Sequence, residues 1–458
     1  MKRIACLLAG LACLLCGCKE EKEPVDEPVS GKINISILNT SSTRTSITVT
    51  INALGHHLDD FDKWGVTMSE TSDCTEGTDV AAPGRPSDGK KEVKIENLKE
   101  NTAYYFWAWA EGKDVERQWT SSHTVVKTRQ KDQPKKLSGT VIGSLYSVDY
   151  STNQQSTSVN VKDNVFDGNY DTYFASYDRS GTWVGLDLGT KHVITKIGYS
   201  PRITQEHRVQ LAVIEGANKP DFSDAIPIHM IKNSAPSRQM SYEDVKCTRG
   251  FRYVRYASPN NVRCNLAELE FHGVEDEGDD SQLYQITNLP LVVINTEGAQ
   301  DIVSKEYEIS SNVYIISEGG KKMLSTSDTG VRGRGNASWL YFEKKPYRLK
   351  FSSKQNVLDA PASAKKWTLI SNYGDKSLMR NILAFEVSRR VGQAYTPYCH
   401  PVDLVVNGEY RGCYQLCDQV EAAKDRVPAK DGYLIEVDSY AAEEDLMFWS
   451  WHGTPVTI

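Results

Sequence analysis

The chain has 458 residues, which at about 150 residues per domain predicts three structural units. Its 53 Lys and Arg residues against 60 Asp and Glu residues give a net charge of -7, and no basic block interrupts the chain. This charge distribution argues against nucleic acid as a partner.

The N-terminus has the pattern of a secretion signal. Two basic residues precede an apolar stretch, residues 4–17, which is too short to span a bilayer. Gly17 followed by Cys18 resembles a bacterial lipobox, in which the Cys thiol receives a diacylglycerol and becomes the new N-terminus. The alternative is an ordinary cleaved signal peptide in which Cys18 has no role. We expect a signal peptide at residues 1–17 and lipidation of Cys18.

The next residues, 18–31, are polar and contain Pro, and we expect them to form an unstructured tether. The Lys and Glu residues at 19–23 resemble the surface-export signal of bacterial lipoproteins. No later stretch approaches the roughly 18 apolar residues that a transmembrane helix needs. These features predict an outer-membrane lipoprotein, exposed at the cell surface and attached to the membrane through its lipid.

Residues 32–130 alternate apolar and polar side chains with period two, as in residues 46–51 and 104–110. Turn residues separate these runs, which predicts a sandwich of antiparallel strands. Leu98 before a polar turn and Tyr104 after it resemble the corner of the fibronectin type III family. The resemblance implies a spacer domain.

A Pro-containing linker precedes a second strand-rich segment, residues 137–273. Four motifs in this segment resemble the F5/8 type C (discoidin) family, whose bacterial members are carbohydrate-binding modules. The motifs lie at residues 165–174, 183–189, 199–202 and 265–273. The resemblance implies a jelly-roll β-sandwich, so that the first two thirds of the chain are expected to be mainly β, and it implies carbohydrate as a partner.

In that family an Asp-Gly loop and a closing Glu commonly hold a structural calcium ion. Ca²⁺ prefers several oxygen ligands, and the matching segments supply them. The candidate ligands are Asp167, Asn169, Asp171, Thr172 and Glu268. The alternative is that these side chains only cap turns.

Sugar binding needs an exposed aromatic ring beside planar hydrogen-bonding groups, because a pyranose has an apolar face and a rim of hydroxyls. The loop candidates are Tyr146, Tyr150, Tyr177, Arg202, Arg208 and Asn261. The alternative is that the aromatic residues belong to the core of the sandwich.

Residues 285–458 mix strands with one expected helix, from about residue 375 to 391. An Asn-Gly turn predicts a hairpin over residues 402–416. Apolar residues repeat at helical spacing in the segment from 375 to 391, which favours a helix there. These are Leu378, Ile382, Phe385, Val387 and Val391.

Five motifs in this unit resemble the spore coat protein H (CotH) kinase family, secreted or surface proteins with an atypical kinase-like fold. They lie at residues 331–339, 344–350, 367–381, 407–412 and 432–438. The resemblance implies an α+β kinase-like domain, ATP and Mg²⁺ as cofactors, and a Ser or Thr of a secreted or surface protein as phosphoacceptor. Because family domains continue well beyond the last motif, we expect this domain to be incomplete.

The resemblance also implies roles for particular residues. The Gly-rich turn would bind phosphates through its amides and two Arg side chains: Arg332, Gly333, Arg334, Gly335 and Asn336. Lys350 would contact the phosphates and pair with Glu386. Glu421 and Asp425 lie in the expected catalytic loop, and Asp438 would bind Mg²⁺.

Two positions depart from the family pattern. Asp425 stands where many relatives have Asn, and Glu421 stands where others have Asp. These changes alter the local charge, so the resemblance alone does not imply activity. Lys350 and Glu386 have a simpler interpretation as a strand charge and a helix-surface pair. A non-enzymatic adhesion or scaffold protein is therefore the alternative to a kinase.

Six Cys residues follow the tether: Cys74, Cys247, Cys264, Cys399, Cys413 and Cys417. They are too sparse for a disulfide framework and lack zinc-site spacing. The sequence favours one pair, Cys247 with Cys264, as a candidate bridge.

Overall fold

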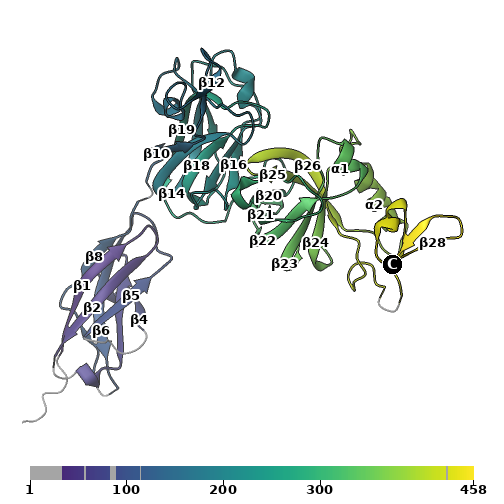
Figure 1. Cartoon of the computed structure of the whole chain (residues 1–458). Helices are drawn as coiled ribbons and strands as arrows, with labels where there is room; N and C mark the ends of the chain where they lie inside the picture. Colours follow the sequence, from purple (N-terminus) through teal and green to yellow (C-terminus); the bar gives the residue numbers. More distant parts are fainter. Residues whose placement is uncertain (1–32, 56–57, 83–88, 114, 131, 430–431) are drawn as a thin grey trace, which may run out of the picture. The chain divides into compact units, whose positions relative to one another are not determined.

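A computed structural model describes residues 33–55, 58–82, 89–113, 115–130, 132–429 and 432–458 (Figure 1). The chain divides into two compact units, Met1–Lys131 and Asp132–Ile458. The predicted signal peptide at 1–17, the tether at 18–31 and the lipidation of Cys18 lie outside the described residues. Among the helices that the structure describes, none is long and apolar enough to cross a bilayer.

The first unit is a β-sandwich whose strands follow the predicted alternation. In β2 every second side chain is buried, and Ile47, Val49 and Ile51 pack with Trp64 and Phe106 of the facing sheet. One sheet contains β1 (Asn34–Ser42), β2 (Ile47–Leu54) and β5 (Lys90–Ile95). The other contains β4 (Thr78–Ala82), β3 (Lys63–Ser69), β6 (Ala103–Glu111), β7 (Gln118–Trp119) and β8 (Thr124–Lys127).

The turn before β6 is closed by the tyrosine that the sequence singled out. The Lys99 backbone N–H donates to the Tyr104 hydroxyl at 2.9 Å, and Leu98 is buried beside it. This bond gives the buried phenol a partner and anchors the turn to the strand. The fibronectin type III resemblance itself stays a prediction.

The second unit begins with a discoidin-type sandwich. Its long strand β14 (Trp183–Pro201) joins two layers, because its first half pairs with β10 and β18 and its second half with β17 and β19. The other strands are β9 (Lys135–Lys136), β10 (Thr140–Gly143), β11 (Ser147–Asp149), β12 (Gln154–Ser156), β13 (Phe174–Ala175), β15 (Val213–Ala217), β16 (Ile226–Met230), β17 (Ser241–Asp244), β18 (Gly250–Ala257) and β19 (Asn265–Glu275). The prediction that this region is mainly β is confirmed.

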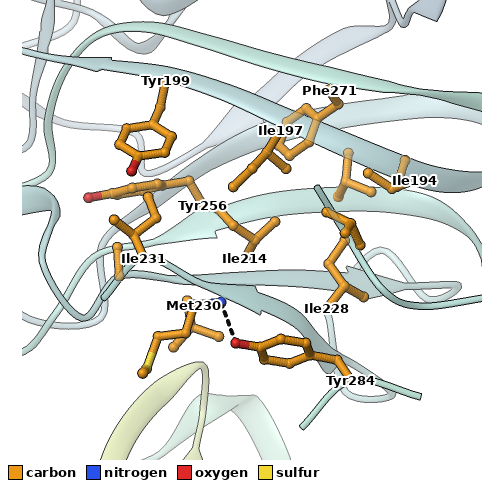
Figure 2. Packing of buried hydrophobic residues seen from close by; sticks show 14 of the residues in the cluster. Ile194, Ile197, Tyr199, Ile214, Ile228, Met230, Ile231, Tyr256, Phe271 and Tyr284 are labelled. Atoms are coloured by element: carbon orange, nitrogen blue, oxygen red, sulfur yellow. Dashed lines mark hydrogen bonds between the residues drawn. The ribbon is translucent and has the colours of Figure 1, made fainter. Parts of the chain in front are cut away.

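The core of this sandwich lies between its two layers. Figure 2 shows Ile197 and Phe271 facing Ile214 and Tyr256 across the interior. Cys247 and Cys264 are also buried there, and both thiols are free, so the candidate bridge between them is not formed. Their burial accounts for these residues as small apolar core side chains.

A closed barrel follows in the same unit. Its seven strands are joined in the order β20 (Leu291–Thr296), β21 (Ile309–Ile316), β22 (Met323–Gly333), β23 (Tyr347–Asn356), β24 (Ser363–Ile370), β26 (Glu409–Asp418) and β25 (Cys399–Val406). Trp367, Leu349, Phe351 and Tyr414 fill its interior. A small sheet of β27 (Glu436–Val437), β29 (Pro455–Thr457) and β28 (Met447–Trp449) ends the chain.

The barrel packs against the discoidin-type sandwich within the second unit. Leu291 and Val293 belong to the same apolar cluster as the sandwich core. The Met230 backbone N–H donates to the Tyr284 hydroxyl at 3.0 Å, the bond drawn in Figure 2. Asn295 Nδ2 donates to the carbonyl of Ala225 at 2.8 Å. The segment between the two folds is therefore part of one packed body.

Two short helices accompany the barrel, α1 (Ala337–Tyr341) and α2 (Arg380–Arg390). The helix predicted from about residue 375 begins later, because Leu378 has a left-handed φ of 59° and the Asp375 carboxylate accepts from the Arg380 amide at 2.8 Å. The apolar residues of α2 are not buried: no residue of the fully described α2 lies in the core, and Leu383 and Val387 are more than half exposed.

The predicted Asn-Gly hairpin is confirmed. It connects β25 and β26, and both turn residues have positive φ, 50° at Asn407 and 82° at Gly408. A two-residue turn of this kind matches the twist of the flanking strands.

Candidate functional sites

Three loops of the discoidin-type sandwich gather arginines and tyrosines. The Arg202 guanidinium lies 4.0 Å from the centroid of the Tyr173 ring and 4.6 Å from that of Tyr150. Arg208, in the short helix η4 (Glu206–Val209), hydrogen-bonds Asn265. We call Tyr150, Tyr173, Arg202 and Arg208 the arginine–tyrosine cluster.

The electrostatics of the arginine–tyrosine cluster favour a polar ligand. Burial lowers the pKa of Arg208, and the nearby cations Arg202 and Arg179 act in the same direction. Tyr150 is 44% exposed, so its ring is accessible. Guanidinium groups beside an accessible aromatic ring can donate hydrogen bonds to the hydroxyls of a sugar, while the ring packs on the apolar face of that sugar.

Two other residues that were predicted to bind sugar, Tyr146 and Tyr177, contact each other through their backbones. The Tyr177 amide donates to the Tyr146 carbonyl at 2.9 Å, and the Arg263 guanidinium is 5.6 Å from the Tyr177 ring centroid. Tyr146 is 42% exposed. Asn261 has a left-handed φ of 58° in its loop.

The predicted calcium loop brings together some of its candidates. Asp167 accepts from the Asn169 amide at 2.8 Å and from the Thr172 hydroxyl at 2.7 Å. Glu268 lies against Asp167 from β19, and its buried Oε1 atom has no hydrogen-bond partner among the described residues. Burial, followed by the contact with Asp167, raises the pKa of Glu268 to about 7.

The hydrogen bonds of this loop are those of turn caps, since Asp167 accepts from the Asn169 amide and Asn169 Oδ1 accepts from the Asp171 amide at 3.0 Å, and the calcium ion stays a prediction. The carboxylates of Asp167 and Glu268 face each other, and no cationic side chain of the described residues is among the main groups that shift the pKa of Glu268. The oxygens of Asn169 and Thr172 lie close by. Asp171 does not join them, since it pairs with Arg238 at 2.5 Å. No group of three or more His, Cys, Asp or Glu side chains suited to a metal occurs in the described part of the chain. Neutral oxygens would therefore have to complete a Ca²⁺ shell.

The Gly-rich turn lies where β22 ends and α1 begins. Gly335 has a φ of 82°, and Gly333 packs so closely on Trp339 that a Cβ atom would lie 2.4 Å from its ring. Burial lowers the pKa of Arg334, and burial followed by proximity to Arg348 lowers that of Arg332. A phosphate would relieve the incompletely balanced charge of these arginines. Asn336 accepts from Lys305 at 3.2 Å.

The structure does not bring Lys350 and Glu386 together. Lys350 on β23 has Glu308 as its acidic neighbour, at 3.6 Å. Glu386 on α2 pairs with Arg389 and Arg390, each at 2.7 Å, and these contacts lower its pKa. Spacings of three and four residues on a helix place such partners side by side. The catalytic roles of Lys350 and Glu386 stay predictions.

The expected catalytic-loop segment is organised by a residue that sequence reasoning missed. Arg426 is 3% exposed, donates to Glu421 at 2.8 Å and lies 3.4 Å from Asp418. Its guanidinium is 5.2 Å from the Trp367 ring centroid. Burial raises the pKa of Asp418. The contact with Trp367, on a strand distant in sequence, leaves no local sequence signal.

The last two predicted residues are solvent-accessible. Asp425 is exposed beside Arg426. Asp438 caps the short helix η7 (Ser439–Glu443), where its carboxylate accepts from the Tyr440 amide at 2.5 Å. The described contacts give neither residue a partner carboxylate for a shared metal ion.

Comparison with known proteins finds similarity in two parts of the chain. The model of the CotH kinase protein family matches residues 331–457. CBM62 from Clostridium thermocellum Xyl5A is 39% identical, with 31% of this chain and 97% of that chain covered and a TM-score of 0.28. No curated protein matches.

Two further solved structures are more distant. An F-lectin (fucolectin) from striped bass (Morone saxatilis) serum is 15% identical, with 51% and 84% of the two chains covered and a TM-score of 0.29. The sensor domain of the anti-sigma factor RsgI4 from Pseudobacteroides cellulosolvens is 17% identical, with 22% and 98% covered and a TM-score of 0.18. Residues 331–457 thus match the CotH kinase protein family, and a separate part of the chain is similar in sequence to CBM62.

Proposed function

We propose that this chain, in which a CotH domain follows a module of carbohydrate-binding type, is a surface protein that binds glycans through the arginine–tyrosine cluster. The observation that carries the proposal is the position of Arg202 over both Tyr150 and Tyr173, with Arg208 nearby. The 39% identity with CBM62 supports the same function.

The chemistry of the cluster suits one sugar residue. Arg202 and Arg208 would donate paired hydrogen bonds to adjacent hydroxyls, because a guanidinium presents its N–H groups in a fixed plane. The accessible ring of Tyr150 would pack against the apolar face of the pyranose. Tyr173 holds Arg202 in place through its ring contact.

A glycan array probed with the full chain tests this proposal. The variants Arg202→Ala and Tyr150→Ala should lose the signal that the wild type gives. Arg252→Ala is the matched control, since Arg252 lies 5.0 Å from the Tyr253 ring centroid and pairs with Asp187 on the same module. Binding that survives Arg202→Ala and Tyr150→Ala would reject the cluster as the site.

A calcium ion bound by Asp167 and Glu268, with the oxygens of Asn169 and Thr172, is part of this proposal. When bound, Ca²⁺ would neutralise the two carboxylates and fix the loop that leads to Tyr173. Asp171 would stay outside the shell, because it pairs with Arg238.

Phosphoryl transfer by the CotH domain is a second candidate function, supported by the family match over residues 331–457. Arg332 and Arg334 would bind nucleotide phosphates together with the amides of Gly333, Gly335 and Asn336. Lys350, Glu386, Glu421 and Asp425 would complete the site. Asp438 would hold Mg²⁺, which supplies charge neutralisation for ATP, and a Ser or Thr of a secreted protein would accept the phosphate.

The competing interpretation is a non-enzymatic adhesion or scaffold protein. The separate pairings of Lys350 with Glu308 and of Glu386 with Arg389 and Arg390 favour it. Incubation of the full chain with labelled ATP and Mg²⁺, beside Asp438→Ala, separates the two. Label that enters the wild type but not the variant supports the kinase, whereas label absent from both supports the scaffold.

Attachment through a diacylglycerol on Cys18, at the outer membrane, completes the proposal. The Lys and Glu residues at 19–23 support surface exposure. Metabolic labelling with palmitate should mark the wild type and not Cys18→Ala. An unlabelled wild-type protein would reject the lipid anchor and leave glycan binding untouched.

A further inference from the structure

The barrel places two cysteines opposite each other. Cys399 begins β25 and Cys417 lies near the end of β26, and the antiparallel register pairs them directly. Both thiols are free. The sequence favoured a different pair of cysteines. Cys399 and Cys417 are 18 positions apart, and the strand register that pairs them cannot be read from the sequence.

The hydrogen-bond pattern shows which kind of pair they form. The adjacent pair, Tyr398 and Asp418, is joined by a backbone bond from the Asp418 N–H to the Tyr398 carbonyl at 3.0 Å. Antiparallel pairs alternate between bonded and non-bonded, so Cys399 and Cys417 form a non-hydrogen-bonded pair. Such pairs have Cα atoms about 4.5 Å apart, within the range of about 4.4–6.8 Å seen in disulfides.

The two thiols differ in a way that suits sequential reaction. Cys417 is buried, whereas Cys399 is partly accessible. The neighbouring Cys417 thiol, the Gln415 side chain and the charge of Arg389 together lower the pKa of Cys399 despite its partial burial. Thiolates are the nucleophiles of disulfide exchange, so Cys399 is the thiol that would react first.

We propose that Cys399 and Cys417 are a reactive dithiol pair that an external disulfide, such as that of oxidised glutathione, converts into a cross-strand disulfide. The Cys399 thiolate attacks one sulfur of the donor, and the other donor sulfur leaves as a thiolate that takes up a proton. Cys417 then loses its proton to solvent and attacks the Cys399 sulfur. The second donor thiol departs, so that one disulfide is consumed and one is formed.

The second step is helped by the first. While Cys399 is a thiolate, its negative charge and the burial of Cys417 raise the pKa of the Cys417 thiol. The mixed disulfide removes that charge, while the nearby cation Arg334 continues to favour the Cys417 thiolate. Cys417 therefore becomes easier to ionise at the moment when it must attack.

The bond would act beside the candidate phosphotransfer segment. Asp418, next to Cys417, accepts from the Tyr398 amide at 3.0 Å and lies 3.4 Å from Arg426. A covalent link between β25 and β26 would hold this end of the hairpin in register. On the α2 side, Arg389 pairs with Glu386 at 2.7 Å and interacts electrostatically with Cys399.

The test uses the reduced full chain, incubated under native conditions with oxidised glutathione and then digested without reduction. Mass spectrometry should find one peptide pair joined through Cys399 and Cys417, and the intact mass should fall by two hydrogen atoms. Cys417→Ser should stop at a glutathione adduct on Cys399. Cys413→Ser is the matched control, because Cys413 lies on the same strand opposite Asp403, and it should leave the bridge intact.

Several results would overturn the proposal. The first is a folded wild-type chain, checked by circular dichroism, that yields no joined peptide after prolonged oxidation. The second is a bridge that uses Cys413 in place of Cys417. If Cys417→Ser fails to fold, alkylation of the wild type during the time course provides the same information, and an adduct first seen on Cys417 would contradict the assigned order.

Discussion

The guanidinium of Arg202 lies 4.0 Å from the ring centroid of Tyr173, at the boundary between the loop proposed to bind calcium and the candidate sugar site. Tyr173 immediately follows Thr172, whose hydroxyl donates to Asp167. The same short segment therefore carries both an oxygen ligand of the candidate cation site and the ring that positions Arg202. This continuity links the two parts of the proposed function.

The contact between Arg202 and Tyr173 should be measurable as a coupling energy. In a double-mutant cycle of Arg202→Met and Tyr173→Leu, we expect a coupling of about 0.5–1 kcal/mol in the free energy of unfolding, the range of cation–π contacts at accessible sites. Urea denaturation of the four proteins measures it. Strictly additive effects would show that the ring does not position the guanidinium.

Without calcium, the stability of the second unit should fall as the pH rises from about 4.5 to 7. The pKa of Glu268 is raised to about 7, so the folded state binds its proton more tightly than the unfolded state does. Stability is then lost as the folded form must ionise, by at most about 3 kcal/mol.

Added Ca²⁺ should reverse this slope by favouring the ionised form of Glu268. Melting temperatures in EGTA and in excess Ca²⁺, across that pH range, measure the effect. Glu268→Gln should remove both the pH dependence and the calcium response, while Asp171→Asn should keep the calcium response. A calcium effect that survives Glu268→Gln would place the ion elsewhere.

Removal of the buried guanidinium at position 426 should destabilise the barrel strongly. Arg426→Ala leaves the buried Asp418 without its cation and opens space over Trp367, and we expect a loss of about 3–5 kcal/mol in the free energy of unfolding. Arg390→Ala is the control, because that guanidinium is largely exposed, and its melting temperature should match the wild type. Equal melting temperatures for both variants would contradict the buried role of Arg426.

Alkylation of Cys399 should become half-maximal at a lower pH than alkylation of an ordinary thiol. The groups that face it, Cys417, Gln415 and Arg389, together lower its pKa. Rates of iodoacetamide labelling, resolved by peptide mapping between pH 5 and 9, provide the measurement. Arg389→Gln should move the Cys399 profile toward higher pH, and an unchanged profile would show that the guanidinium has no influence.

Features fixed by neighbouring residues could be predicted from the sequence. Asn407 and Gly408 form the predicted hairpin turn because both tolerate positive φ, and the alternation in β2 gave the buried face of the first sandwich. The mainly β class follows from the same local patterns.

Features that depend on distant contacts could not be predicted in this way. The Asp375 cap and the left-handed Leu378 shorten the expected helix, and Glu386 pairs within α2 although a longer-range partner was expected. The pairing of Cys399 with Cys417 requires the strand register. Tyr173 was part of a recognised motif, but only the folded loops show its ring against Arg202.

The central claim is that the arginine–tyrosine cluster binds a glycan. Isothermal titration calorimetry with the strongest array ligand, applied to the wild type, Arg202→Ala and Arg252→Ala, tests it most directly. We predict equal affinities for the wild type and Arg252→Ala and an affinity at least about tenfold weaker for Arg202→Ala, a loss of about 1.4 kcal/mol. Equal affinities for all three proteins would contradict the account.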